Sequence, residues 1–130
     1  DVEISNFHFL NAGGAGPEDA RKADHTEFIL RNGYPDIPDS KYPACGLYIK
    51  NAKNVKLFNC TFDNLQYDHR TAIAAESVEN LKIMMTEARN CAGLLRHYKV
   101  ENLQTALCDG EMITFTEEQA KAAYEEMTQK

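Results

Sequence analysis

The carboxylates of this chain are the side chains best suited to acid–base chemistry, but their spacing does not predict a catalytic pair. Hydrolysis of a glycosidic bond requires two carboxyl groups about 5 to 10 Å apart across a cleft. Asp63 and Asp68 flank a turn and could face solvent together, although acids at such positions more commonly stabilise the turn itself. The pairs Glu117–Glu118 and Glu125–Glu126 belong to a helical pattern, where we expect them to be surface charge. No catalytic residue is therefore predicted.

The histidines and cysteines form no metal-binding or redox motif in the sequence. The histidines lie far apart without metal-ligand spacing, and the cysteines include no C-x-x-C pair. P-loop, dinucleotide-binding and nucleophile-elbow patterns do not occur. The residues considered are His8, His25, His69, His97, Cys45, Cys60, Cys91 and Cys108. We expect no metal and no cofactor, and we expect His97, which replaces an apolar strand residue, to be hydrogen-bonded or exposed rather than a general base.

Length and charge restrict the class of protein. A chain of 130 residues corresponds to one domain, and its net charge of −6 disfavours binding to the phosphate backbone of nucleic acid. There is no Lys/Arg cluster for an anionic membrane and no apolar run near the roughly 18 residues that span a bilayer. Residues 1–20 contain no signal peptide, and the chain starts inside a strand-like phrase without an initiator Met. We therefore expect a piece of a longer protein, or a processed one.

A phrase of alternating apolar residues bounded by polar turn residues, mostly asparagine, recurs along the chain. Residues 1–11 align without gaps on residues 54–64, residues 80–90 give a third copy, and a degraded fourth copy starts at Asn102. The last three copies are offset by 26 and then 22 residues. Such periods are typical of a solenoid, whose repeats stack because one repeat cannot bury its own apolar face.

The strands indicate which solenoid this is. The short period-2 segments Leu47–Ile49 and Val55–Phe62 are separated by the polar turn Lys50–Asn54, and no helical stripe accompanies them. The sequence therefore predicts an all-β parallel β-helix of about four coils, in which each strand pairs with its copy above. Stacking would align the turn asparagines into a hydrogen-bonded ladder of Asn54, Asn80 and Asn102. A leucine-rich repeat is the alternative, but there Asn follows the leucines, whereas here Asn precedes the apolar strand.

The stacking also bears on the cysteines. Cys60 and Cys108 occupy equivalent places two repeats apart, which corresponds to about 9–10 Å in a stack of strands. A disulfide needs Cα atoms within about 7 Å, so we expect small buried thiols instead. Asn59-Cys60-Thr61 is formally a glycosylation acceptor, but it lies inside the strongest strand phrase and we discount it.

Two segments depart from the repeat. Residues 12–45 are predicted to be an irregular insertion, with one or two helical turns near Pro17–Ala23 and a proline-rich excursion over Arg31–Pro43. Its length suggests either a functional loop or an excursion packed on the side of the helix. Residues 116–130 carry a capping box and an apolar stripe, which predict an amphipathic helix covering the open end of the solenoid, or else a frayed tail. The β-helix itself is expected over residues 1–115.

Three local motifs, added to the repeat, carry a family resemblance. A strand ending in N-x-G-G at Asn11–Gly14 leads into an acidic insertion, and a proline-rich run closes on P-A-x-G-L-Y at Pro43–Tyr48. A D-x-R-x-A-I phrase at Asp68–Ile73 precedes the V-E-N-L strand at Val78–Leu81. Over roughly residues 1–110 the chain resembles the C-terminal coils of family 28 glycoside hydrolases, the polygalacturonase-like enzymes. The resemblance implies a right-handed parallel β-helix.

The same resemblance implies a non-catalytic role. The catalytic motifs of that family are Asn-Thr-Asp, Asp-Asp, Gly-His-Gly and Arg-Ile-Lys; they lie upstream of the matching region and do not occur in this chain. The expected function is therefore a C-terminal segment, inactive alone, of a secreted or periplasmic hydrolase acting on pectin-type polysaccharide. The alternative is a non-enzymatic β-helical module that binds glycan or associates with itself through its open ends. Neither nucleic acid nor a membrane is an expected partner.

Overall fold

The structure is a computed structural model that describes residues 1–16 and 44–114 of the chain. Within this part, all regular structure is β-strand, and the strands form two sheets in which every pair is parallel. One sheet has the order β1-β3-β5-β7-β8 and the other the order β2-β4-β6. The strands are β1 (Val2–Ser5), β2 (His8–Gly13), β3 (Ala44–Phe58), β4 (Thr61–Gln66), β5 (Asp68–Met84), β6 (Glu87–Ala88), β7 (Cys91–Ala106) and β8 (Met112–Thr114).

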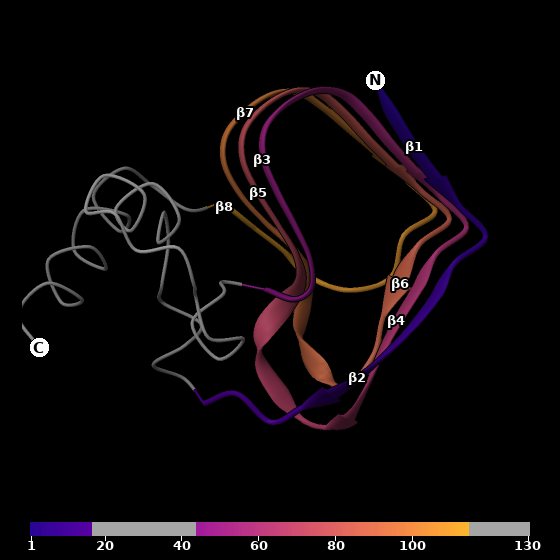
Figure 1. Cartoon of the computed structure of the whole chain (residues 1–130), viewed down its shortest axis with the longest axis vertical. Coiled ribbons are helices and arrows are strands. Elements are labelled where there is room, and N and C mark those ends of the chain that lie inside the picture. The colour runs from indigo at the N-terminus through magenta and orange to yellow at the C-terminus, as the bar shows by residue number, and fades with distance from the viewer. Residues whose placement is uncertain (17–43, 115–130) are drawn as a thin grey trace, which may run out of the picture.

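Successive repeats of the chain lie directly above one another, and Figure 1 shows their traces following the same path around a common interior. Val2 pairs with Val55, Val55 with Leu81, and Leu81 with Leu103. The gap-free alignment of the first two phrases is confirmed, because β1 and β2 pair with β3 and β4 at the expected offset. An all-β stack of parallel strands is consistent with the predicted parallel β-helix. It differs from a leucine-rich repeat, in which each unit supplies one strand and a helical segment.

The strand boundaries differ from the prediction at the polar turn Lys50–Asn54. This segment is not a break between strands, because β3 continues through it and its residues pair with β5. The chain bends there without losing its parallel partner, since Asn51 and Asn54 adopt left-handed backbone with φ of 53° and 55°. The predicted strand Val55–Phe62 is instead divided, ending at Phe58 and resuming at Thr61.

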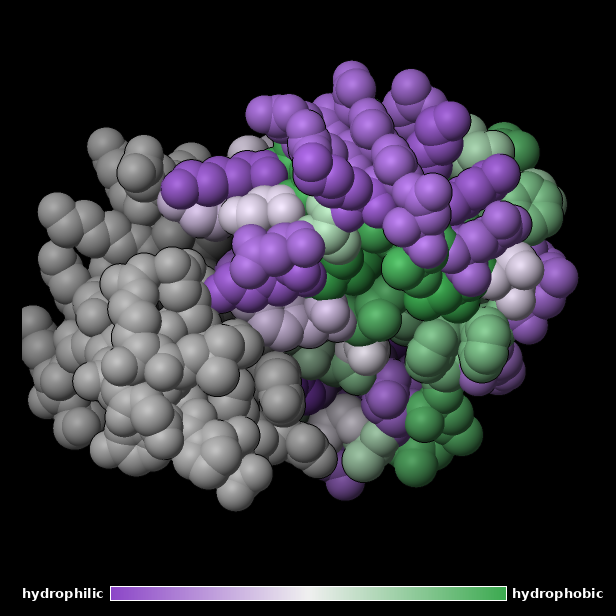
Figure 2. Space-filling model, turned by 45° about the horizontal axis from the view of Figure 1, so that its top comes forward, coloured by the Kyte–Doolittle hydropathy of each residue, from purple (hydrophilic) through white to green (hydrophobic). Residues whose placement is uncertain are grey.

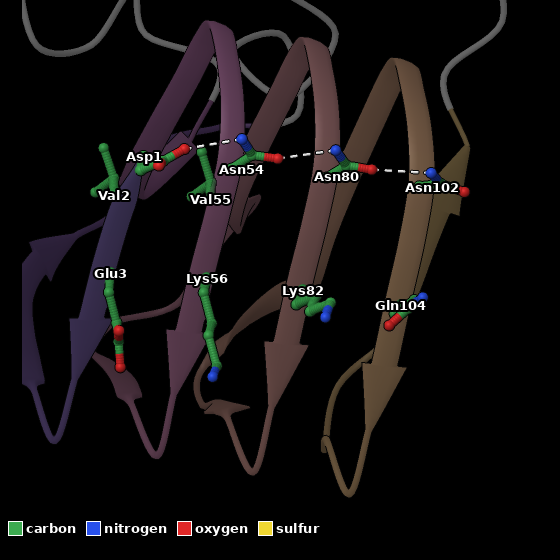
Figure 3. Close-up of a pocket in the computed structure, with 10 residues that line it drawn as sticks. All are labelled: Asp1, Val2, Glu3, Asn54, Val55, Lys56, Asn80, Lys82, Asn102 and Gln104. Atoms are coloured by element: carbon green, nitrogen blue, oxygen red, sulfur yellow. Dashed lines mark hydrogen bonds between the residues drawn. The ribbon is translucent and has the colours of Figure 1, made fainter.

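The asparagine ladder is confirmed. The Asn80 side-chain Nδ2 donates to Asn54 Oδ1, and Asn102 Nδ2 donates to Asn80 Oδ1, both at 2.8 Å. Asn54 Nδ2 donates in turn to Asp1 Oδ1 at 2.8 Å (Figure 3). All three asparagines have left-handed backbone, which costs less for Asn than for most other residues with a Cβ. The ladder therefore offsets part of the strain of the turn that it occupies.

A second corner carries the same kind of ladder only in its first two repeats. Asn59 Nδ2 donates to Asn6 Oδ1 at 2.8 Å. The next two residues in this row are Met85 and Leu107, which also have left-handed backbone (φ of 50° and 55°) but cannot form the side-chain bond. Their side chains are 46% and 84% exposed. The fold therefore keeps two apolar residues at its surface in an unfavourable backbone conformation.

The interior is filled by the apolar rows that the repeat predicts. Leu47, Ile73 and Leu95 are stacked in register, and the ring of Phe9 lies parallel to that of Phe62 at 4.7 Å. Gly46 is needed where β3 passes this core, because a Cβ there would lie 2.6 Å from the Phe62 ring. The fully or nearly buried apolar residues include Val55, Leu57, Phe62, Ile73, Ala75, Val78, Leu81, Ile83, Leu94 and Leu95.

The two segments outside the repeat lie largely beyond the described residues. Ala12 and Gly13, placed in the insertion by the sequence, belong to β2, and Ala44 and Cys45 belong to β3. The predicted helical turns near Pro17–Ala23 and the proline-rich excursion over Arg31–Pro43 lie outside the described residues. The amphipathic helix expected over residues 116–130 lies outside them as well.

Removing one member of the ladder tests its contribution to stability. Asn80→Ala loses both ladder hydrogen bonds and the residue type suited to left-handed backbone, so the free energy of unfolding should fall by about 2 kcal/mol. Asn80→Gly loses the same hydrogen bonds but adopts that backbone freely, so it should lose about 1 kcal/mol. Urea denaturation followed by circular dichroism measures both values. The exposed strand variant Glu101→Ala is the control, and equal losses for Ala and Gly would contradict the backbone contribution.

Completing the second ladder should stabilise the protein. In the double variant Met85→Asn/Leu107→Asn, each new amide can donate to the oxygen of the row member before it, and left-handed strain is reduced. We expect the free energy of unfolding to rise by about 1 kcal/mol. Leu65→Asn is the matched control, because it also removes an exposed apolar side chain but lies outside the left-handed positions. A stability equal to or below that of the parent chain would contradict this account of the corner.

Candidate functional site

A shallow groove of about 540 Å³ crosses the outer face of the strands that carry the asparagine ladder. One wall is the ladder itself, from Asp1 on one side to Asn102 on the other (Figure 3). The groove runs across the strands, in the direction in which the repeats stack, because each repeat adds an equivalent residue to its wall. Amide side chains can both donate and accept hydrogen bonds, as recognition of hydroxyl groups requires.

The second row of the groove carries charge. Glu3, Lys56, Lys82 and Gln104 are paired in register on four neighbouring strands, and all four side chains are exposed. They follow the ladder residues by two positions and therefore lie on the same outer face. The row is acidic at β1, basic at β3 and β5, and neutral at β7. Its centre is thus a pair of ammonium groups beside a row of amides, an arrangement suited to a ligand with carboxylates and hydroxyls.

A separate polar cluster lies on the first halves of the same long strands. The Tyr48 hydroxyl of β3 donates to Glu76 Oε2 of β5 at 2.9 Å. Arg96 of β7 stands in the same row as Tyr48, because both residues pair in register with Ala74 of β5. Glu76 and Arg96 are only 4% and 6% exposed. Burial lowers the pKa of Arg96 to about 10, although the nearby Glu76 carboxylate and Tyr48 favour its charged form. Arg96 is therefore still a cation at neutral pH, held beside an acid and a phenol.

Asp68 and Arg70 form a buried ion pair at the start of β5. Asp68 is fully buried; its Oδ1 accepts hydrogen bonds from the Arg70 N and Nε, and its Oδ2 accepts them from Arg70 Nη2 and Ala15 N, at 2.9 to 3.3 Å. Burial alone would raise the pKa of Asp68, but the hydrogen bonds from Arg70 and Ala15 outweigh it and hold that pKa below its usual value. The pair joins the segment after β2 to β5. Both carboxylate oxygens of Asp68 are already occupied by hydrogen bonds, so Asp68 is not available for acid–base catalysis.

The acids considered from the sequence are thus kept apart. Asp63 and Asp68 do not face solvent together as a pair, because Asp68 is buried against Arg70 while Asp63 accepts a hydrogen bond from the Asn64 backbone at 2.9 Å. Both acids instead accept local backbone hydrogen bonds, Asp68 from Arg70 N two residues on, which agrees with the turn-stabilising role that the sequence favoured for them. Glu117–Glu118 and Glu125–Glu126 lie outside the described residues.

The histidines are also dispersed. His8 is exposed, and exposed His69 contacts Ala15 O through Nδ1 at 3.0 Å and the Tyr67 ring edge-on. His97 is half-buried, and its Nε2 lies 3.3 Å from Thr114 Oγ1. Burial lowers the pKa of His97, so the neutral ring is favoured at pH 7. His25 lies outside the described residues.

The four cysteines are free thiols. Cys60 and Cys108 occupy one row, as predicted, with Thr86 between them. Cys60 is buried, as expected, whereas the other three thiols are half-buried. Cys45 Sγ donates to the Thr71 carbonyl oxygen at 3.5 Å, and Cys91 Sγ donates to the Gly93 carbonyl oxygen at 3.3 Å. The interaction between the two thiols raises the pKa of Cys45 and lowers that of Cys91 to about 7.

Sequence reasoning missed the lysine row and the buried Glu76–Arg96 cluster. The lysine row had a signal, because Lys56 and Lys82 each stand two residues after a ladder asparagine. The cluster had a weaker one: Tyr48 and Arg96 occupy equivalent positions two repeats apart, but nothing local indicates that Glu76 and Arg96 are buried.

Among residues 1–16 and 44–114, no three His, Cys, Asp or Glu side chains gather in a way that could hold a metal ion. No helix in this part of the chain has the length and hydropathy needed to cross a bilayer.

Comparison with known proteins does not assign the chain to a family. No protein-family model matches it, and neither a curated protein nor a solved structure shows significant similarity to it. The family 28 resemblance therefore has the sequence motifs alone as its support.

The Asp68–Arg70 pair predicts a pH dependence of stability. Because the pKa of Asp68 is lowered on folding, its contribution is complete above the unfolded-state pKa of about 3.9 and is lost as the pH falls through the folded-state pKa. Asp68→Asn should reduce the free energy of unfolding by about 3 kcal/mol at pH 7 and by clearly less at pH 3. Denaturation midpoints over this range, with Asp63→Asn as control, measure the difference. A loss that is the same at both pH values would contradict the ionic role of Asp68.

Proposed function

We propose that this chain is a non-catalytic C-terminal segment of a polygalacturonase-like glycoside hydrolase, and that it provides a binding surface for acidic, pectin-type polysaccharide. In this proposal the stack is a right-handed parallel β-helix of about four coils, capped by a helix over residues 116–130, in a secreted or periplasmic protein. The motifs between Asn11 and Leu81 support the family, and the parallel register supports the fold. Cleavage itself would belong to residues upstream of this segment.

The groove with its two rows is the observation that carries the binding proposal. Lys56 and Lys82 come from adjacent strands, which are about 4.8 Å apart, so the groove presents two neighbouring ammonium groups to the carboxylates of a uronate polymer. The amides of Asn54, Asn80 and Asn102 line the other side, within reach of sugar hydroxyls. An extended glycan lying along the stack would therefore meet equivalent partners at each repeat.

The charge of the whole chain limits how such a ligand binds. A net charge of −6 does not attract a polyanion over long distances, so affinity has to come from short-range contacts to the lysines and amides. Exposed ion pairs of this type contribute modestly and weaken with salt. We therefore expect weak, salt-sensitive binding that discriminates between acidic and neutral glycans.

Titration calorimetry with polygalacturonate oligosaccharides tests this function. The 130-residue chain should bind them more tightly than a neutral oligosaccharide of equal length, and Lys56→Ala/Lys82→Ala should weaken binding at least fivefold. Lys53→Ala is the matched control, because Lys53 is an exposed lysine of β3 that already pairs with Glu79 at 3.2 Å and does not line the groove. Equal binding of acidic and neutral glycans, or an equal effect of both variants, would contradict the proposal.

A second candidate function is self-assembly as a non-enzymatic module. β1 and β2 are edge strands of the two sheets, and the core residues Ile4 and Phe9 on them are only partly buried. Figure 2 shows hydrophobic side chains reaching the surface of the viewed face beside a hydrophilic area. Open edges and uncovered apolar residues favour pairing with another chain. Sedimentation velocity distinguishes the two functions, since a concentration-dependent dimer without glycan affinity would favour this one.

A further inference from the structure

The segment Asn59-Cys60-Thr61, which has the sequence pattern of an N-glycosylation acceptor, lies at a corner of the stack rather than inside a strand. Its place within an apolar phrase counted against modification, but β3 ends at Phe58 and β4 begins at Thr61. Asn59 is exposed and has left-handed backbone with φ of 54°, whereas Cys60 is buried. No other asparagine of the 130-residue chain is followed two positions later by Ser or Thr. An attached glycan is bulky and needs a surface position, which Asn59 provides.

The side-chain amide of Asn59 can be modified without loss of its contact in the fold. Its Nδ2 carries two N–H groups, and donation to Asn6 Oδ1 at 2.8 Å needs only one of them. A glycosidic bond replaces one N–H group and leaves the other. The backbone of the corner is held separately, because Asn59 N donates to Met84 O at 3.0 Å and Thr61 N donates to Phe7 O at 2.8 Å. The corner therefore keeps its hydrogen bonds when the amide carries a sugar.

Two apolar side chains lie uncovered beside Asn59 on the same corner. Met85 and Leu107 follow it in the row and are 46% and 84% exposed. Neighbouring coils are about 4.8 Å apart, so these residues lie roughly 5 and 10 Å from Asn59 along the stack. The first sugar rings of a glycan attached to Asn59 reach that far. A glycan that covers the two side chains reduces the apolar surface exposed at this corner.

We propose that Asn59 is the acceptor of an N-linked glycan whose first sugars lie over Met85 and Leu107. In the transfer, Asn59 Nδ2 forms a bond to the anomeric carbon of an oligosaccharide that is carried on a lipid pyrophosphate. The bond from that carbon to the pyrophosphate oxygen breaks, the lipid pyrophosphate leaves with the electron pair, and Nδ2 loses one proton to a base of the transferase. Nothing is oxidised or reduced. The proposal rests on the export of the chain that the proposed function includes.

Mass spectrometry of the 130-residue chain secreted from a eukaryotic cell tests the acceptor. We expect one glycan per chain, on Asn59, which a peptide N-glycosidase removes to leave an aspartate there. Thr61→Ala should lose the glycan, whereas the conservative Thr61→Ser should keep it. Asn54, Asn80 and Asn102 are internal controls, because they are also exposed and left-handed but lack the hydroxyl residue two positions on. Far-UV circular dichroism confirms that each variant is folded.

Oxidation of Met85 by hydrogen peroxide tests where the glycan lies. Peptide mapping of the same secreted chain, before and after removal of the glycan, compares the rates of sulfoxide formation. We expect Met85 to react at least about threefold more slowly while the glycan is present, because the glycan limits the access of peroxide to the thioether. Met112, which is 38% exposed and lies in β8, is the internal control and should react at the same rate in both forms.

Three results would overturn the proposal. A folded, secreted chain without a glycan on Asn59 would refute the acceptor, and so would a Thr61→Ala variant that keeps the glycan. Equal oxidation of Met85 in the two forms would refute the position of the sugars. None of these readouts involves uronate binding, so a failure of this proposal is distinguishable from a failure of the proposed function.

Discussion

Parallel backbone pairing between successive repeats is the constraint on which the other features of this molecule depend. It fixes the distance between equivalent residues at about 4.8 Å, so a residue type that recurs in the sequence becomes a continuous row in space. Apolar rows fill the interior, an asparagine row forms the ladder, and a row with Lys56 and Lys82 faces solvent beside it. Where two repeats differ in length, the extra residues have to lie in the segments between the paired rows. The repeat starting at Leu81 is shorter mainly between β6 and β7, where two residues replace the five between Phe62 and Asp68.

The corners are where this regularity is energetically weakest. Each turn of the chain that the structure describes in full passes through left-handed positions, some of which hold Asn and some Ser, Lys, Met or Leu. Asparagine offsets the strain with a side-chain hydrogen bond to the repeat before it, whereas Met85 and Leu107 do not. The buried Asp68–Arg70 pair works differently, because its charges cost free energy to bury and are stabilising only while both partners are present. It secures the corner at which β5 begins, where the pairing with β7 also shifts.

Much of the fold could be predicted from the sequence because it is encoded locally and repeated. The alignment of residues 1–11 on 54–64 already contains the pairing of four strands, and the ladder follows from the spacing of its asparagines. The lysine row was predictable from the same register once rows, rather than catalytic sets, were sought. The irregular steps in the pairing of β3 with β5 and of β5 with β7 were not predictable, because nothing in the repeat marks them. Nor does any local pattern indicate that Glu76 and Arg96 are buried.

The distribution of charge along the groove gives a direction to any acidic ligand that binds there. The carboxylates of Asp1 and Glu3 lie at the β1 side, while Lys56 and Lys82 lie in the middle and amides follow on β7. Screening at physiological salt confines these charges to a range of about 8 Å, which is less than two strand spacings. A carboxylated polymer is therefore attracted at the centre and repelled only at the β1 end, so its contacts should extend from the lysines toward Asn102 and Gln104. The order of the strands thus determines the polarity of the surface, because each strand contributes one residue to the row.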